Sequence, residues 1–566
     1  MIRTRITDFH QRLSSSDGRF ELLVIAVTAI ALVLRLVVWH RSWTQIDEPA
    51  SVLAIEMVAT KGIPLFPSNV LYLQGAFFSY LAAPLAWFLD GHALLNAAQL
   101  LYLGLAVTLV PITMLYTRYI TSSHLATTLV GVFVACDPNL IAWSVAIRPY
   151  GLLAVETILT LYCFTRILVE GQQVRIAGVR ALYWLPVLAT IGTFTHIGYW
   201  LIAPGIALVA LVCWGSRLQS VSRSILICSI LPLAAPVAFV LLGKYVGVGN
   251  GTGGQTSKET VMGSHLFSFE RLIDAPAIRW SSWTSNFIAG SFHESLPSII
   301  VLCSGVLTLR AISGDRTVES PAAATLLVTH WTMILMVVTL VVYDAQPRYL
   351  LHSLPLGYIV IGWSVAIVWE SVRRHDLVPR SVIRGGLAFL IILPTLANSV
   401  TAADWQLDRP GYDADYWEIT AWVGEHYEDG QFIITSLPPA AWFWFPESTI
   451  DNQTYFLAGP ESRARSRRYI KTTSDGEASE YWLGIPPITS VKSLCSILKD
   501  GAGKTWLITD AARLKASWAY RGEMAELILA TTLVVHQGPD GSQARFVRPI
   551  SDWNLKVTAE CIFLNT

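Results

Sequence analysis

The sequence predicts a polytopic α-helical membrane protein that carries an α/β domain at its C-terminal end. Three observations lead to this prediction. The 566 residues are 53% hydrophobic and only 14% charged, whereas an average soluble domain has about 25% charged residues. Apolar runs of about 18 residues or more recur between residues 20 and 402. From residue 404 onward the chain becomes polar, mixed in charge and rich in aromatic residues. The net charge is zero, so nothing in the composition suggests a nucleic-acid partner.

The apolar runs predict about eleven membrane-spanning helices. We place these helices near residues 20–40, 93–117, 124–142, 150–168, 180–195, 197–214, 224–243, 297–313, 321–343, 350–372 and 382–402. The first run has basic flanks but is too long for a cleavable signal peptide and lacks a small-residue exit, so it is interpreted as a membrane anchor. Arg35, near the end of this run, is expected to extend its side chain toward the membrane surface.

One further apolar run, "YLQGAFFSYLAAPLAWFL" at residues 72–89, decides the topology of everything after it. If this run does not cross, the arginines near the N-terminus and those in alternate later loops all face the cytoplasm, as the positive-inside rule requires. If it does cross, the N-terminal arginines disagree with the rest. We therefore expect residues 72–89 to form an amphipathic or re-entrant helix on the outer face. An odd number of spans then places the C-terminal domain outside.

The C-terminal part has the pattern of a small α/β domain. Residues 415–427 predict an amphipathic helix, because their apolar residues recur at helical spacing. The segments "QFIIT" and "TWLIT" predict strands. The predicted division is a transmembrane domain at 1–403, with a first outer loop at 41–92 and a long outer loop at 244–296, followed by an extracytoplasmic domain at 404–566. Five of the seven cysteines lie in or beside apolar runs, and the sequence leaves open whether Cys495 and Cys561 pair.

Polar side chains from several sequence-distant loops are expected to gather at the outer membrane boundary. These loops supply Asp47, Glu48, Arg148, Tyr150, His196, Arg348 and Tyr349. An ionisable residue near membrane depth is a functional candidate by default. A carboxylate accepts the proton of an attacking hydroxyl, and a guanidinium binds phosphate oxygens through two parallel hydrogen bonds. Such a set suits group transfer from a lipid phosphate.

Structural explanations of the same residues stay open beside this one. Asp47 and Glu48 precede a proline in "IDEPASVLAIEMVA", as the cap and first turn of a helix do. Arg148 and Arg348 also fit side chains that reach the membrane interface from a helix end. His196 lies between two apolar runs, where a polar residue that fills a turn is as common as a site residue.

Several segments in this order resemble the GT-C membrane glycosyltransferases, of the protein O-mannosyltransferase, aminoarabinose transferase and rhizobial lipopolysaccharide glycosyltransferase types. The resemblance is carried by "DEP" with "AIEMVATKGIP" after the first span, "YLQGAFFSYLAAPLAWFLDG", "IRPYGLLAVETIL", "QPRYLLHSLPLGYIVIGW" and the tail segments "ITAWVGEHYEDGQFIIT" and "TWLITD". Together these segments extend over nearly the whole chain.

The resemblance implies an inverting transferase of the cell membrane that moves one sugar from a polyprenyl-phosphate donor on the outer face. The acceptor would be a glycan, a lipid-linked glycan or a protein. Asp47 matches the proposed general base and Glu48 its neighbour. Arg148, Tyr150 and Arg348 match positions near the donor phosphate. Tyr349, next to Arg348, and His196, in a separate outer loop, complete the predicted set of binding residues.

Two other functions, and a divalent metal as cofactor, remain alternatives. A transporter or flippase would place charges deep within its spans, whereas here the charges gather at the outer boundary. An oligosaccharyltransferase shares the fold class, but typically needs a larger soluble domain and a set of acidic metal ligands. Some GT-C members carry a further acid before the juxtamembrane helix, yet "LFPSNVLYLQG" has none, so no metal site is assigned. His265, His293 and Glu294 remain as distant potential ligands of a divalent metal.

Overall fold

A computed structural model describes most of the chain. The described residues are 16–42, 44–72, 75–215, 224–230, 296–313, 320–340, 351–374, 414–459, 469–472, 477–515, 520, 522–553 and 561. The chain divides into two compact units. The first, here called the helical unit, comprises Met1–Arg41, Gln99–Phe239 and His265–Trp405. The second, the sheet unit, comprises Ser42–Ala98, Val240–Ser264 and Gln406–Thr566.

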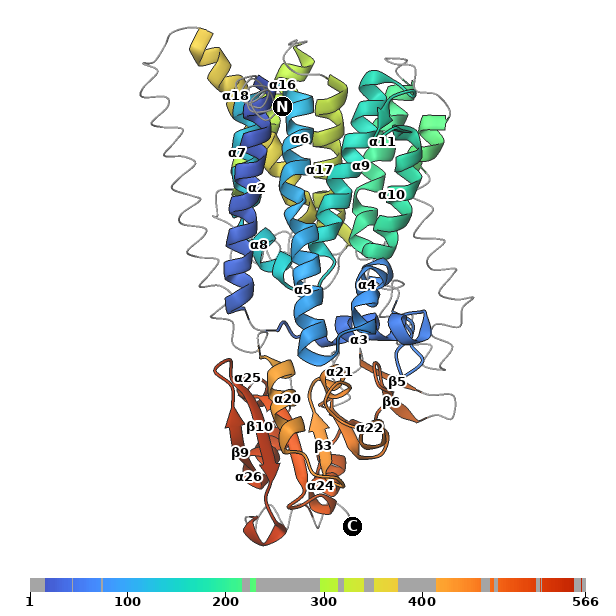
Figure 1. Ribbon diagram of the computed structural model, residues 1–566, viewed down its shortest axis with the longest axis vertical. Helices are drawn as coiled ribbons and strands as arrows, with labels where there is room; N and C mark the ends of the chain where they lie inside the picture. Colours follow the sequence, from blue (N-terminus) through green and yellow to red (C-terminus); the bar gives the residue numbers. More distant parts are fainter. Residues whose placement is uncertain are drawn as a thin grey trace, which may run out of the picture. The chain divides into compact units, whose positions relative to one another are not determined.

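The helical unit is a bundle of apolar helices that lie side by side (Figure 1). Its helices are α2 (Ser16–Arg41), the second part of α5 (Gly91–Val107), α6 (Leu109–Thr121), α7 (His124–Cys136), α8 (Pro138–Val145), α9 (Tyr150–Glu170), α10 (Ala181–Thr195), η2 (Ile197–Leu201), α11 (Ala203–Gly215), α16 (Leu296–Ile312), α17 (Ser320–Leu340) and α18 (Leu354–Arg374). A short hairpin of β1 (Arg175–Ile176) and β2 (Val179–Arg180) joins α9 to α10.

Within the described residues, five helices are long and apolar enough to cross a membrane, and six if the bent pair α7–α8 counts as one span. The outward surface agrees with a membrane location, since Ile25 of α2 is 65% exposed and Val33 is 58% exposed. A continuous apolar surface of this kind is unfavourable in water and favourable in lipid. The predicted polytopic membrane class is therefore supported. The count of eleven spans stays a prediction, because two of the predicted segments fall largely outside the described residues.

Arg35 does not reach the membrane surface, so that prediction is wrong. Its side chain is 0% exposed. Its guanidinium donates to the carbonyl oxygens of Ala135 at 3.0 Å and Val134 at 3.3 Å, in the last turn of α7. The chain bends by 51° between α7 and α8, and carbonyl groups at a helix end lack partners within the helix. Arg35 satisfies these groups, which explains why a cation is retained inside the bundle.

Asp137 stands at the bend itself and completes the arrangement. Its Oδ1 accepts from the Leu140 N–H at 2.7 Å and so caps α8. Its Oδ2 accepts from the Tyr358 hydroxyl of α18 at 2.5 Å. Asp137 also interacts electrostatically with Arg35. A buried cation and a buried anion therefore hold the two broken helix ends together.

The sheet unit is built on a six-stranded mixed sheet with strand order β7-β4-β3-β8-β10-β9. Its strands are β3 (Phe432–Thr435), β4 (Thr454–Leu457), β7 (Pro487–Ile488), β8 (Thr505–Asp510), β9 (Thr532–Gln537) and β10 (Ser542–Val547). The first four run parallel, and β10 pairs antiparallel with both β8 and β9. The predicted strands "QFIIT" and "TWLIT" are β3 and β8, which are neighbours. All six residues of β8 are buried, as is typical of a strand covered on both faces.

The sheet unit also contains helices, and residues 44–98 contribute some of them (Figure 1). The helices are α3 (Glu48–Lys61), α4 (Ala76–Ala82), η1 (Ala83–Trp87), α20 (Tyr416–His426), α21 (Pro438–Ala441), α22 (Glu447–Gln453), α24 (Val491–Asp500), α25 (Ala511–Lys515), α26 (Gly522–Thr531) and η4 (Ile550–Asp552). A small hairpin of β5 (Ile470–Thr472) and β6 (Ala478–Glu480) lies outside the main sheet. The helix predicted at 415–427 is α20, and the α/β prediction for this region is supported.

Adjacent strand residues point to opposite faces and so divide the core in two. On one face, Ile433 and Trp506 share a core with Leu53 and Phe66 of the first loop. On the other face, Leu507 packs in a second core with residues of α24 and α26. The first loop is therefore an integral layer of the sheet unit. The predicted boundary near residue 404 stays a prediction, since residues 404–413 lie outside the described part.

The run at 72–89 forms α4 and η1, an apolar segment that extends from Ala76 to Trp87. A helix of this length is too short to cross a bilayer, which needs about 20 residues. Both pieces pack on α3. This agrees with the prediction that the run does not span, while its location on the outer face stays a prediction.

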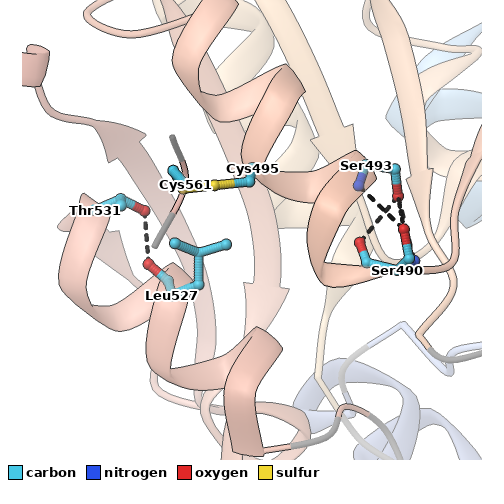
Figure 2. Close-up of a disulfide and its surroundings, with 6 residues drawn as sticks. All are labelled: Ser490, Ser493, Cys495, Leu527, Thr531 and Cys561. Carbon is cyan, nitrogen blue, oxygen red and sulfur yellow. Dashed lines mark hydrogen bonds between the residues drawn. A yellow bond between two sulfur atoms is a disulfide. The ribbon is translucent and has the colours of Figure 1, made fainter. Parts of the chain in front are cut away.

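Cys495 and Cys561 form a disulfide that joins α24 to the C-terminal end of the chain (Figure 2). Their Cα atoms are 5.6 Å apart, which is within the usual range for a disulfide. The pairing question that the sequence left open is thus answered. Figure 2 also shows that Ser490 and Ser493 cap the same helix reciprocally, with the Ser493 N–H donating to Ser490 Oγ at 3.0 Å. The cap closes the first turn of α24, and the disulfide ties the helix to Cys561.

Glu480, at the end of β6, is fully buried, and backbone N–H groups are its hydrogen-bond partners. Its carboxylate accepts from the Trp482 N–H at 2.6 Å and the Leu483 N–H at 2.8 Å. Burial raises the pKa of Glu480 to about 7, although these hydrogen bonds and Lys471 act in the opposite direction. Between pH 4.5 and about 7 the folded protein therefore retains a proton that the unfolded chain releases.

We expect the stability of the sheet unit to fall as pH rises through this window, by at most about 3 kcal/mol from Glu480. Glu480→Gln does not titrate, so it should flatten the dependence of the melting temperature on pH between 5 and 8. Asp415 acts in the same direction and leaves part of the slope, because burial also raises its pKa to about 7. The exposed Glu425 provides a matched control through Glu425→Gln. Equal slopes in wild type and Glu480→Gln would contradict the assignment.

Candidate functional site

The predicted site residues fall in both units. Asp47 and Glu48 belong to the sheet unit, whereas Arg148, Tyr150 and His196 belong to the helical unit. Arg348 and Tyr349 lie outside the described residues. The local surroundings of the first five residues can therefore be compared, each within its own unit.

The turn before α3 is closed by three hydrogen bonds among three residues. The Gln45 N–H donates to Glu48 Oε2 at 2.5 Å, and the Glu48 N–H donates back to the Gln45 carbonyl at 2.8 Å. The Asp47 N–H donates to the Gln45 side-chain oxygen at 2.9 Å. Glu48 as a whole is only 1% exposed. Glu48 therefore shapes the turn that presents Asp47.

Asp47 itself occupies the N-cap position of α3, but its carboxylate makes no capping hydrogen bond to that helix. Pro49 lies in the first turn, where the missing N–H costs nothing. The residue is half-buried. The preference of helix N-caps for aspartate explains why Asp47 stands at this position. It does not explain the role of the carboxylate, which makes no capping hydrogen bond.

Two contacts connect this turn and helix to distant parts of the sheet unit. The Trp442 indole N–H donates to Glu56 Oε1 of α3 at 3.2 Å. Burial raises the pKa of Glu56, and the nearby charge of Asp90 acts in the same direction. The Thr44 N–H donates to Asp415 Oδ2 at 3.0 Å. The sequence contained no signal for either pairing, because each joins residues more than 300 positions apart.

In the helical unit, the predicted residues Arg148, Tyr150 and His196 do come together. The Arg148 guanidinium carbon lies 6.0 Å from the centroid of the Tyr150 ring. The Tyr150 and His196 ring centroids are 5.1 Å apart. Arg148 stands in a tight turn, with its N–H donating to the Ala146 carbonyl at 2.7 Å. The Pro149 that follows directs the chain into α9.

His196 stands at the break between α10 and η2, where the two predicted spans were expected to turn. Its Nδ1 accepts from the Gly198 N–H at 2.9 Å, so the neutral ring carries its proton on Nε2. The chain folds back so closely that a Cβ on Gly192 would meet the Tyr199 ring at 2.2 Å. A glycine is therefore required at position 192 to hold this break.

Sequence reasoning missed the buried acid beside this break. Glu156 of α9 accepts from the Thr195 hydroxyl at 2.7 Å. The Tyr199 hydroxyl bonds Thr160 Oγ1 at 2.9 Å, and His352 lies beside the Gly198 backbone. The available signal was a lone glutamate within the apolar run 150–168, which is unusual in a span.

Across the described ranges, no three side chains of the ligand types His, Cys, Asp and Glu are grouped closely enough to hold a metal. The segment before α4 carries no acid. His265, His293 and Glu294 lie outside the described residues. The described side chains thus offer no metal centre on which a catalytic step can be built.

The chain thus combines a bundle of apolar helices with a unit in which short helices of the first loop share a core with an α/β sheet. Its fold is shared with solved structures of the GT-C membrane glycosyltransferases.

Two solved structures illustrate the likeness. The oligosaccharyltransferase of Archaeoglobus fulgidus in its apo form aligns over 95% of this chain and 76% of its own, with TM-score 0.56 and 12% identity. ArnT from Cupriavidus metallidurans bound to undecaprenyl phosphate aligns over 94% of this chain and 98% of its own, also with TM-score 0.56 and 12% identity.

The same archaeal enzyme, AglB, in complex with an inhibitory peptide and a dolichol-phosphate, aligns over 96% of this chain and 76% of its own. Its TM-score is 0.53 at 12% identity. At such identity the likeness is one of fold. No protein-family model matches the chain, and no curated protein matches it.

Proposed function

We propose that the protein is a membrane glycosyltransferase that moves a single sugar from a polyprenyl-phosphate donor to an acceptor outside the cytoplasm. The observation that carries this proposal is the Asp47 carboxylate, which a closed turn presents at the start of α3 in a chain with the GT-C fold. A carboxylate that is anchored but not used for capping fits a general base.

In the proposed reaction, Asp47 takes the proton of the acceptor hydroxyl. The acceptor oxygen bonds to the anomeric carbon of the sugar, and the bond from that carbon to the phosphate oxygen breaks. The electron pair leaves with the polyprenyl phosphate. Attack opposite the leaving phosphate inverts the anomeric configuration. Glu48 keeps Asp47 in place through the turn with Gln45.

Arg148 and Arg348 are proposed to neutralise the phosphate, because a guanidinium binds phosphate oxygens in a bidentate manner. The ring of Tyr150 lies against the Arg148 guanidinium and limits its motion. His196 packs on the other side of Tyr150, and Tyr349 follows Arg348 in sequence. Holding the guanidinium in one orientation lowers the entropic cost of binding the phosphate.

The proposed location is the cell membrane, with eleven spans and with the soluble domain at 404–566 on the extracytoplasmic side. The Cys495–Cys561 disulfide supports this orientation, since disulfides persist in oxidising compartments. The first outer loop is proposed to lie on the same side, because it shares a core with the C-terminal sheet. The distribution of arginines in the sequence supports the same assignment.

The two structural neighbours favour different versions of this chemistry. ArnT was solved with undecaprenyl phosphate, and AglB was solved with a dolichol-phosphate and a peptide. An oligosaccharyltransferase is therefore the second candidate. Single-sugar transfer is preferred because this chain spans the full length of ArnT, 98% of it, but only 76% of the larger archaeal enzyme.

The test is transfer by the purified protein in detergent or liposomes. We expect it to consume a polyprenyl-phosphate monosaccharide and release polyprenyl phosphate, with inversion seen by NMR of the product. Consumption of a polyprenyl-diphosphate oligosaccharide instead would establish the oligosaccharyltransferase alternative. Movement of the donor across a liposome bilayer without any new glycosidic bond would establish a flippase and overturn the proposal.

A further inference from the structure

The carboxylate of Asp415 serves two distant parts of the sheet unit at once. Its Oδ1 accepts from the Trp417 N–H at 3.1 Å and the Glu418 N–H at 3.0 Å, which caps α20. Its Oδ2 accepts from the Thr44 N–H at 3.0 Å. A helix cap needs one side-chain oxygen. The second oxygen therefore does something that capping does not require.

Thr44 lies three residues before Asp47, at the entrance of the turn that leads into α3. The hydrogen bonds among Gln45, Asp47 and Glu48 make this turn rigid within itself. Ile46, within the turn, packs in the core that the first loop shares with the C-terminal sheet. The Thr44–Asp415 hydrogen bond attaches the entrance of the turn to the sheet unit.

Asp415 is itself held from the other side. Its N–H donates to Asp540 Oδ2, and Asp540 Oδ1 accepts from the Ser542 hydroxyl at 2.8 Å at the start of β10. A continuous series of hydrogen bonds thus runs from β10 through Asp540 and Asp415 to Thr44. Asp415 is 6% exposed, and burial of a carboxylate is costly without such partners.

We propose that Asp415 is a positioning residue for Asp47, which fixes the turn before α3 so that the Asp47 carboxylate meets the acceptor hydroxyl. This inference rests on the proposed function. A displacement of about 1 Å in a reacting group costs on the order of 100-fold in rate. The hydrogen bond between Thr44 and Asp415 should therefore affect kcat for sugar transfer more than KM for the donor.

The experiment uses Asp415→Asn in the full-length protein. The asparagine oxygen keeps the α20 cap, since Asn caps as well as Asp. Its amide group faces the Thr44 N–H, where two donors cannot bond. We expect kcat per folded molecule to fall between about tenfold and 100-fold, with an unchanged KM for a polyprenyl-phosphate monosaccharide. The melting temperature should fall moderately, because the buried Thr44 N–H loses its acceptor.

The matched control is Glu418→Gln, which removes one negative charge from the same turn of α20. The Glu418 side chain is 64% exposed and its carboxylate lies 3.5 Å from His92, so the kcat of this variant should equal that of wild type. Asp415→Ser provides a second variant, because serine keeps a capping oxygen and lacks the oxygen that reaches Thr44. It should show the same loss of kcat as Asp415→Asn.

A wild-type kcat in Asp415→Asn and Asp415→Ser would overturn the inference, as would a rise in KM at constant kcat. An equal loss of kcat in Glu418→Gln would also overturn it, because the charge and not the hydrogen bond would then be responsible. Asp47→Asn separates this inference from the proposed function. If Asp47→Asn retains activity, the base assignment fails, whereas if only Asp415→Asn retains it, the positioning role alone fails.

Discussion

Asp47→Asn is expected to lower kcat for sugar transfer by about 100- to 10,000-fold, the usual contribution of a general base. Asparagine has nearly the same shape as aspartate but cannot accept the proton of the acceptor hydroxyl. Asparagine is accepted at the N-cap position of a helix as well as aspartate is, so the variant should fold and keep its melting temperature. KM for the donor should change little, since the base acts on the acceptor.

The measurement is transfer from a polyprenyl-phosphate monosaccharide by purified protein, with the melting temperature recorded on the same sample. Glu48→Gln is the matched control in the adjacent residue. Glutamine retains an oxygen that accepts from the Gln45 N–H, so the turn should survive and most of the activity with it. Full activity of Asp47→Asn would show that another group is the base. Complete inactivity of Glu48→Gln with normal folding would assign Glu48 a direct chemical role.

Arg35→Met is expected to produce the largest loss of stability in the helical unit. The substitution leaves the carbonyl groups of Val134 and Ala135 without their donor and leaves Asp137 without its cation. Removal of one partner from a buried pair costs about 3–5 kcal/mol, because the other charge stays buried. The loss should appear as a lower melting temperature, or a lower midpoint in a denaturant titration, of the detergent-purified protein.

Two companion variants test the physical reason. Tyr358→Phe removes a single hydrogen bond to Asp137 and should cost only about 1–3 kcal/mol. The double variant Arg35→Met with Asp137→Asn should be less destabilised than the sum of the single variants, since no charge is then left unpaired. Strict additivity would show that the two side chains do not interact. A wild-type melting temperature for Arg35→Met would show that the network is dispensable.

The local elements of this protein were readable from its sequence because each depends on neighbours within about ten residues. The apolar runs predicted spans that the structure has at α2, α9 and α18. The spacing of apolar residues after Asp415 predicted α20, and the Asp at its start is the observed cap. The β-branched segments predicted β3 and β8. In each case the periodicity of side chains already specifies which face is buried.

The burial and the hydrogen-bond partners of each candidate residue could not be predicted from the sequence in the same way. Asp47 and Glu48 are adjacent in sequence, yet one carboxylate is buried in a turn while the other is half-exposed. Arg35 has the sequence context of a side chain that reaches the membrane surface, but the bend between α7 and α8 supplies unpaired carbonyl groups that it binds instead. Such partners depend on how helices pack, which periodicity does not specify.

The sequence by itself determined the membrane class, the α/β character of the C-terminal region and the identity of the acidic pair, since these follow from composition and local pattern. Only the tertiary structure decided that the first loop shares a core with the C-terminal sheet, and that Asp415 binds the backbone of Thr44 across 371 positions. The physical reason is that long-range contacts form where buried surfaces fit and polar groups find partners. No short stretch of sequence contains both sides of such a contact.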